Sequence, residues 1–158
     1  MARLSNETLS RAKARVPAYD RAAIGIGIVH LGPGAFHRGH QAVYTEDAIE
    51  ISGGDWGICA VSLNSRGTAD DMTAQDGLYT LAIRDKAPSN RIIGAIKEVL
   101  CARIEPDMVM ARLTAATTKF VTLTITEKGY ALTAAGALDA TNARIAADLK
   151  SPRSQCTG

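Results

Sequence analysis

Short apolar runs alternate with amphipathic segments along the chain. Residues 24–31 (IGIGIVHL) are apolar on both faces and rich in β-branched side chains, which predicts a strand buried between two layers. Residues 56–63 and 119–126 predict two further strands. Apolar residues at helical spacing predict helices over residues 38–51, within 64–77, over 105–116 and over 137–149. The alternation of strands and helices favours an α/β domain with a mainly parallel sheet.

Two segments depart from simple alternation. Residues 78–84 and 91–99 predict the two strands of an inserted hairpin, joined by a polar turn over 85–90. At the start of the chain, Ser5 is a candidate cap for a helix over residues 6–15, which Pro17 would end. We therefore expect residues 1–22 to form a helical appendage.

Composition narrows the classes of partner. The net charge is +2 and no long run of like charges occurs, so we expect neither a nucleic-acid nor a membrane partner. The three cysteines form no C-x-x-C pair, which favours a reducing compartment. No apolar run approaches the roughly 18 residues that span a bilayer, and the basic first residues carry no apolar signal segment. The sequence predicts a cytoplasmic location.

The turn after the first predicted strand carries the candidate chemistry. A glycine turn between a buried strand and a helix allows backbone N–H groups to approach the phosphates of a dinucleotide. Gly32 and Gly34 fit the first two glycine positions of that fingerprint, whereas His37 stands at the third. On this pattern alone, a structural turn and a nucleotide loop remain equal alternatives.

Three motifs resemble one known family. Residues 28–47 (IVHLGPGAFHRGHQAVYTED), 75–81 (QDGLYTL) and 123–130 (LTITEKGY) are similar to the mannitol dehydrogenase and fructuronate reductase family of long-chain polyol dehydrogenases. The resemblance implies an incomplete Rossmann-like domain over residues 23–150, with a mainly parallel sheet, helices on both faces and the inserted hairpin. It also implies binding of NAD and interconversion of a polyol or sugar-acid hydroxyl and a ketone.

The resemblance also implies the site residues. The expected cofactor-binding residues are Gly32, Pro33, Gly34, Ala35, Phe36, His37, Arg38 and Asn64. Asn64 follows the second strand, where an acid usually binds the ribose, and the nearby Arg66 leaves NADP open as an alternative to NAD. Glu127, at the end of a strand, is the one expected active-site residue. A metal site at His37 and His40 is the weaker reading, so no metal is predicted.

The family's catalytic pattern, K-x-x-x-x-N-x-x-H, lies in a helical C-terminal domain and does not occur in these 158 residues. We therefore expect no catalytic residue of that set here, a truncated tail at 151–158, and no activity of this chain alone. A truncated sheet would leave an unpaired edge, which predicts self-association. The alternative is a stand-alone, non-catalytic nucleotide-binding or interaction module.

Overall fold

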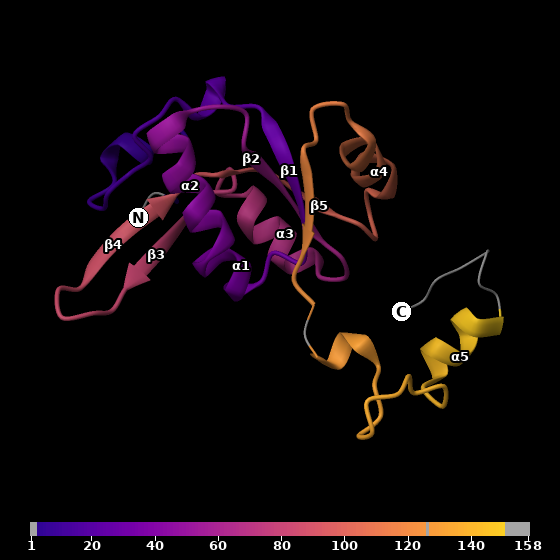
Figure 1. The fold of residues 1–158 in the computed structure, drawn as a ribbon. Coiled ribbons are helices and arrows are strands. Elements are labelled where there is room, and N and C mark those ends of the chain that lie inside the picture. The colour runs from indigo at the N-terminus through magenta and orange to yellow at the C-terminus, as the bar shows by residue number, and fades with distance from the viewer. Residues whose placement is uncertain (1–2, 126, 151–158) are drawn as a thin grey trace. The chain divides into compact units, whose positions relative to one another are not determined.

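The computed structural model describes residues 3–125 and 127–150. Within them, the main sheet has four parallel strands in the order β5-β2-β1-β6 (Figure 1). The strands are β1 (Ile26–Leu31), β2 (Gly57–Ser62), β5 (Ile96–Cys101) and β6 (Phe120–Leu123). The chain runs outward from β1 to β2 and β5, then crosses back to place β6 on the other side of β1. The predicted mainly parallel sheet is confirmed, and its direction of winding reverses between β1 and β6.

The central strands are buried on both faces because alternate residues enter two different cores. Ile28 belongs to a cluster with side chains of α2 (Gln41–Ser52) and α3 (Arg66–Thr73). Its neighbour Val29 belongs to a second cluster, to which α4 (Pro106–Thr114) contributes. Figure 1 shows α4 set apart from α2 and α3. Helices therefore cover both faces of the sheet, as predicted.

The inserted hairpin is present, but its second strand ends earlier than predicted. Strands β3 (Tyr79–Ile83) and β4 (Ser89–Ile93) pair antiparallel. The prediction of one strand over residues 91–99 was wrong, because β4 ends and β5 begins within that segment. Gly94 and Ala95 lie between the two strands, and an added Cβ at Gly94 would lie 2.7 Å from Cγ of Pro17. The absence of a side chain at Gly94 therefore lets the N-terminal segment pack closely against this junction.

The N-terminal segment does not form the predicted helix over residues 6–15. Only a single 3-10 turn, Leu9–Arg11, forms there. The backbone of Arg15 instead bonds to β4: its N–H donates to Asn90 O at 3.3 Å, and Ile92 N–H donates to Arg15 O at 2.7 Å. Pairing with a strand distant in sequence therefore overrides the local helical preference.

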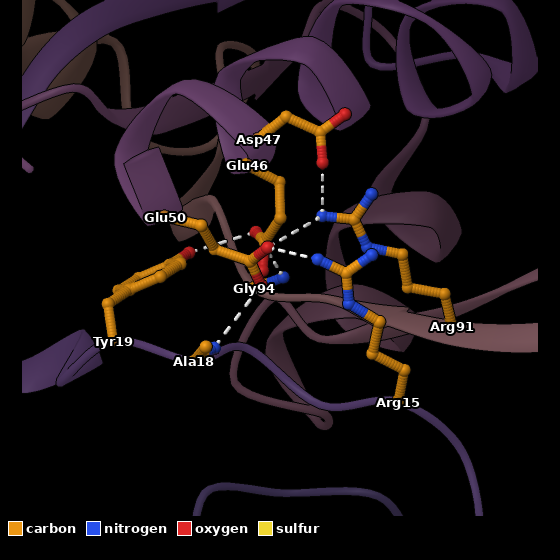
Figure 2. Close-up of polar contacts among 8 residues, drawn as sticks. All are labelled: Arg15, Ala18, Tyr19, Glu46, Asp47, Glu50, Arg91 and Gly94. Carbon is orange, nitrogen blue, oxygen red and sulfur yellow. Dashed lines mark hydrogen bonds and ion pairs between the residues drawn. The ribbon is translucent and has the colours of Figure 1, made fainter. Parts of the chain in front are cut away.

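A group of mostly charged side chains, which we name the charged cluster, joins this segment to α2 and β4 (Figure 2). Its members are Arg15, Ala18, Tyr19, Glu46, Asp47, Glu50, Arg91 and Gly94. Glu46 is fully buried, and its Oε2 accepts from Tyr19 Oη at 2.9 Å and from Gly94 N–H at 2.8 Å. Nη2 of Arg91 lies 2.6 Å from Oδ1 of Asp47. These contacts hold three separate stretches of the chain together.

Residues from Ile125 onward form a second compact unit. It contains a 3-10 helix at Glu127–Tyr130, a bridge between Leu132 and Leu138, and α5 (Ala143–Lys150). The helix predicted over residues 137–149 therefore begins later than expected. The predicted tail at 151–158 lies outside the described residues. In the part of the chain that the structure describes, no helix is both long and apolar enough to cross a membrane.

Candidate functional site

The glycine turn lies where the winding of the sheet reverses. It follows β1 directly, and the N–H of Gly32 donates to Val61 O of the neighbouring strand at 2.9 Å. Gly32 has a φ of +88°, a conformation that favours glycine. The helix α1 (Ala35–Gly39) starts immediately after the turn. Open α/β sheets bind ligands at this reversal point, beyond the carboxyl ends of their strands.

The backbone of the turn is open to an approaching ligand. A Cβ added at Gly34 would meet only the carbonyl oxygen of Gly32, at 3.9 Å. Gly34, Ala35 and Phe36 are all exposed, whereas Pro33 is buried. The φ of Gly34 is −71°, which any residue can adopt. A side chain at position 34 would therefore project into open space without straining the backbone.

Arg38, in the helix that follows the turn, stabilises the turn by hydrogen bonding to it. Its Nη1 donates to Pro33 O at 3.0 Å, and its own carbonyl accepts from Tyr79 Oη at 2.6 Å. Burial raises the pKa of Tyr79, so this hydroxyl keeps its proton at neutral pH. A cavity of about 380 Å³ opens beside Arg38 and is lined by Arg38, Thr68, Asp71, Met72, Gln75, Tyr79 and Thr80.

The His37 ring points into the protein. His37 is 1% exposed, and its ring stacks on that of His30, with centroids 3.6 Å apart. Burial, with His30 as the next contribution, lowers the pKa of His37 to about 4. Direct contact between this ring and a phosphate stays a prediction. Its hydrogen-bond partner Gln41 was not predicted as a site residue, although it lies within the motif over residues 28–47, because that motif assigns it no role.

The segment after β2 lies at the same edge of the sheet as the turn, because Leu31 and Val61 are in register. Asn64 and Arg66 are both exposed there. The guanidinium of Arg66 forms an ion pair of 3.2 Å with Asp70, one helical turn further along α3. No acid occurs between the end of β2 and α3, so the position that usually binds a ribose through a carboxylate holds neutral side chains.

The remaining candidates are Glu127 and the two histidines of the weaker metal-site hypothesis. Glu127 belongs to the second unit, so its place near the active site stays a prediction. His37 is buried whereas His40 is exposed, so their rings do not converge. Nδ1 of His40 instead lies 2.9 Å from the carbonyl oxygen of Phe36. Among residues 3–125 and 127–150, no group of three or more His, Cys, Asp or Glu residues is placed to hold a metal.

Comparison with known proteins gives consistent results. A family model described as the mannitol dehydrogenase Rossmann domain matches residues 26–157. D-mannonate oxidoreductase from Escherichia coli K12 is 41% identical over 86% of this chain and 29% of its own length. Polyol:NADP oxidoreductase from Gluconobacter oxydans 621H is 38% identical over 98% of this chain and 33% of its own length.

A solved structure agrees. The ternary complex of Pseudomonas fluorescens mannitol 2-dehydrogenase with NAD and D-mannitol superposes with a TM-score of 0.84 and 36% identity, over 96% of this chain and 32% of that one. The resemblance drawn from the three motifs is therefore confirmed. The chain spans about a third of the length of the curated relatives it matches.

Proposed function

Since the chain belongs to the mannitol dehydrogenase family through its Rossmann domain, we propose that it is the nucleotide-binding portion of an oxidoreductase that interconverts a polyol or sugar-acid hydroxyl and a ketone. Its cofactor is NAD, bound at the loop of residues 32–38. The observation that carries this proposal is the open backbone of Gly34 at the point where the sheet reverses its winding.

The residues of the turn fit a dinucleotide. The missing side chain at Gly34 lets the pyrophosphate approach the backbone closely, and the exposed Ala35 and Phe36 leave that path clear. Arg38 holds the turn by its bond to Pro33 and places a positive charge near the phosphates. When bound, the nicotinamide ring accepts or donates the hydride.

Two residues near the expected ribose position, Asn64 and Arg66, bear on the choice between NAD and NADP. In this proposal Asn64 bonds the ribose hydroxyls of NAD. NADP is the alternative, because the exposed Arg66 could pair with a 2′-phosphate in place of Asp70. The named relatives include one crystallised with NAD and one named for NADP. Parallel titrations with NADH and NADPH, repeated on Arg66→Ala, distinguish the two: only NADPH binding should weaken.

A titration that follows NADH fluorescence tests the loop. We expect the parent to bind NADH. Gly34→Val should bind NADH at least about tenfold more weakly, because the valine side chain would occupy the phosphate position. Gly39→Val is the matched control, since an added Cβ there has nothing within 4 Å outside its own helix. Circular dichroism should show both variants folded. If Gly34→Val bound as tightly as the parent, the loop assignment would be wrong.

We also propose that this chain alone does not oxidise polyols. Oxidation of a secondary alcohol needs a general base at the hydroxyl and donors that stabilise the developing alkoxide. No lysine in the 158 residues starts the K-x-x-x-x-N-x-x-H pattern, and Glu127 alone would stabilise an alkoxide poorly. With NAD and mannitol, or NADH and fructose or fructuronate, absorbance of the reduced nicotinamide should stay constant. Turnover within a hundredfold of an enzyme's usual roughly ten per second would refute this.

The edge of the sheet supports the expected self-association. In the described residues, β6 pairs with β1 alone, and its side chains Val121 and Leu123 are 47% and 57% exposed. An unpaired apolar edge is a template for pairing with another strand, and we propose a second copy as its partner. Sedimentation should show dimers that Val121→Lys weakens. A monomer at high concentration would contradict the proposal.

A further inference from the structure

Beneath the glycine turn lies a line of hydrogen-bonded polar groups, of which the rings of His30 and His37 are buried and the other members half-buried. The groups come from the ends of β1 and β6, from the turn itself, and from the starts of α1 and α2. We name them the buried relay: His30, Gly32, His37, Gln41, Thr122 and Thr124. Their sequence positions span 30 to 124, so the relay connects both sides of the point where the sheet reverses.

The carbonyl oxygen of Gly32 fixes the direction of every bond in the relay. A carbonyl only accepts, so Nε2 of His30, 3.2 Å away, must carry a proton. In a neutral ring Nδ1 is then bare, and the hydroxyl of Thr122 donates to it across 2.8 Å. Thr122 Oγ1 lies 3.1 Å from Nε2 and 3.2 Å from Oε1 of Gln41. Because its one proton is committed to His30, it accepts from Nε2 and does not donate to Oε1. The amide oxygen of Gln41 is left to accept from Nδ1 of His37 at 3.2 Å.

The two stacked rings are therefore opposite tautomers. His30 carries its proton on Nε2, which also lies 2.9 Å from Oγ1 of Thr124, and His37 carries its proton on Nδ1. This assignment explains why Nε2 of His37 is buried without a partner: it is a bare lone pair, which costs less to bury than an N–H that lacks an acceptor. Burial lowers the pKa of both rings, so both are neutral at pH 7.

We propose that the buried relay is a positioning device that holds the glycine turn in its nucleotide-binding shape. The relay acts on the turn through the carbonyl oxygen of Gly32, which accepts from His30 and, at 2.7 Å, from the N–H of Gly34. The orientation of this carbonyl therefore fixes the conformation of the backbone that would meet the phosphates. Thr122 is its central residue, because its hydroxyl carries the hydrogen-bonded link between His30 and Gln41. This inference rests on the proposed function, which supplies the ligand of the turn.

The first test reads the tautomers directly. In the full chain labelled with ¹⁵N, long-range ¹H–¹⁵N correlation spectra at pH 7 should show a protonated Nε2 for His30 and a protonated Nδ1 for His37. The exposed His40 is the internal reference. Two rings with the same tautomer, or a charged ring at pH 7, would overturn the relay.

The second test breaks the relay at its middle. Thr122→Val removes the hydroxyl at nearly constant volume, and Thr122→Ser retains it. We expect Thr122→Val to bind NADH about tenfold more weakly, and hydrogen exchange at the Gly34 amide to become about tenfold faster, because the hydrogen bonds of this hydroxyl to His30 and Gln41 are lost. Thr122→Ser should restore both values and the parent's tautomers, which a loss of packing alone would not explain.

The outcomes separate this inference from the proposed function. Suppose that the parent does not bind NADH, but that hydrogen exchange at the Gly34 amide is faster in Thr122→Val and normal in Thr122→Ser. The proposed function then fails and the positioning role stands. If the parent binds NADH and Thr122→Val matches it in affinity and exchange, the relay has no positioning role.

Discussion

The first residue of α2 and the later part of that helix carry two different kinds of polar group. Its first residue, Gln41, belongs to the neutral buried relay under the glycine turn. Residues further along, Glu46, Asp47 and Glu50, belong to the charged cluster that fastens the N-terminal segment and β4 (Figure 2). One helix thus contacts the glycine turn through hydrogen bonds between neutral groups, and it contacts the N-terminal segment and β4 through charged side chains.

The difference follows from what each region must tolerate. Buried ions resist separation, because removing one partner leaves an uncompensated charge, so the charged cluster suits a permanent junction. Near a site for an anionic ligand, a buried carboxylate would repel the phosphates, whereas neutral groups order the backbone without that repulsion. We therefore expect changes in the charged cluster to alter global stability, and changes in the relay to alter the turn.

The largest effect should come from Glu46→Ala. Its carboxylate accepts from the Tyr19 hydroxyl and the Gly94 N–H, so its removal leaves both donors without this acceptor. Arg91 keeps its ion pairs with Asp47 and Glu50. We expect the free energy of unfolding in urea to fall by about 3 kcal/mol. The exposed Glu7→Ala is the control and should change it little. The affinity of the folded protein for NADH should be unchanged in both variants. A tenfold loss of NADH affinity in Glu46→Ala would contradict the view that the charged cluster affects global stability and not the turn.

Tyr19→Phe should have a smaller effect of the same kind. It deletes one hydroxyl that donates to Glu46 at 2.9 Å and leaves the ring in place. The pKa of Tyr19 is raised, chiefly by burial and by Glu46, so the hydroxyl donates at any pH used for the measurement. We expect a loss of about 1 kcal/mol in urea unfolding. No measurable loss would mean that the hydrogen bond to Glu46 contributes nothing net.

The smallest effect concerns the charge of the relay. The pKa of His37 falls from 6.5 to about 4 on folding, so the unfolded chain binds a proton more readily and stability is lost as pH falls from 6.5 towards 4. Between pH 7 and pH 6 the parent should lose about 0.7 kcal/mol relative to His37→Phe, which cannot titrate there. Urea unfolding at both pH values measures the difference. Equal pH dependence in the two proteins would show that His37 is not held neutral.

Local sequence signals were sufficient for the elements that carry the site. The apolar run ending at Leu31 and the glycines after it predicted the strand and the turn that the structure contains, where Gly32 has a φ of +88°. Helical spacing predicted one helix over residues 38–51, which the structure divides at His40 into α1 and α2. These features follow from periodicity and from backbone conformations that only glycine adopts easily.

Contacts distant in sequence were not predictable in the same way. The division of residues 91–99 between two sheets depends on Pro17 and Arg21 packing against Gly94. The inward direction of His37 depends on His30, and its link to Thr122 passes through a residue with no motif of its own. Such pairings are set by tertiary packing, which a single sequence does not reveal.

Mapping of NADH binding by backbone amide chemical shifts tests the central claim most directly. In ¹⁵N-labelled protein titrated with NADH, we predict the largest shifts at Gly32, Gly34 and Ala35, smaller shifts at Asn64, and none at Gly94 in the charged cluster. These shifts should saturate with one dissociation constant. Shifts centred on Gly94, with the amides of the glycine turn unmoved, would contradict the account.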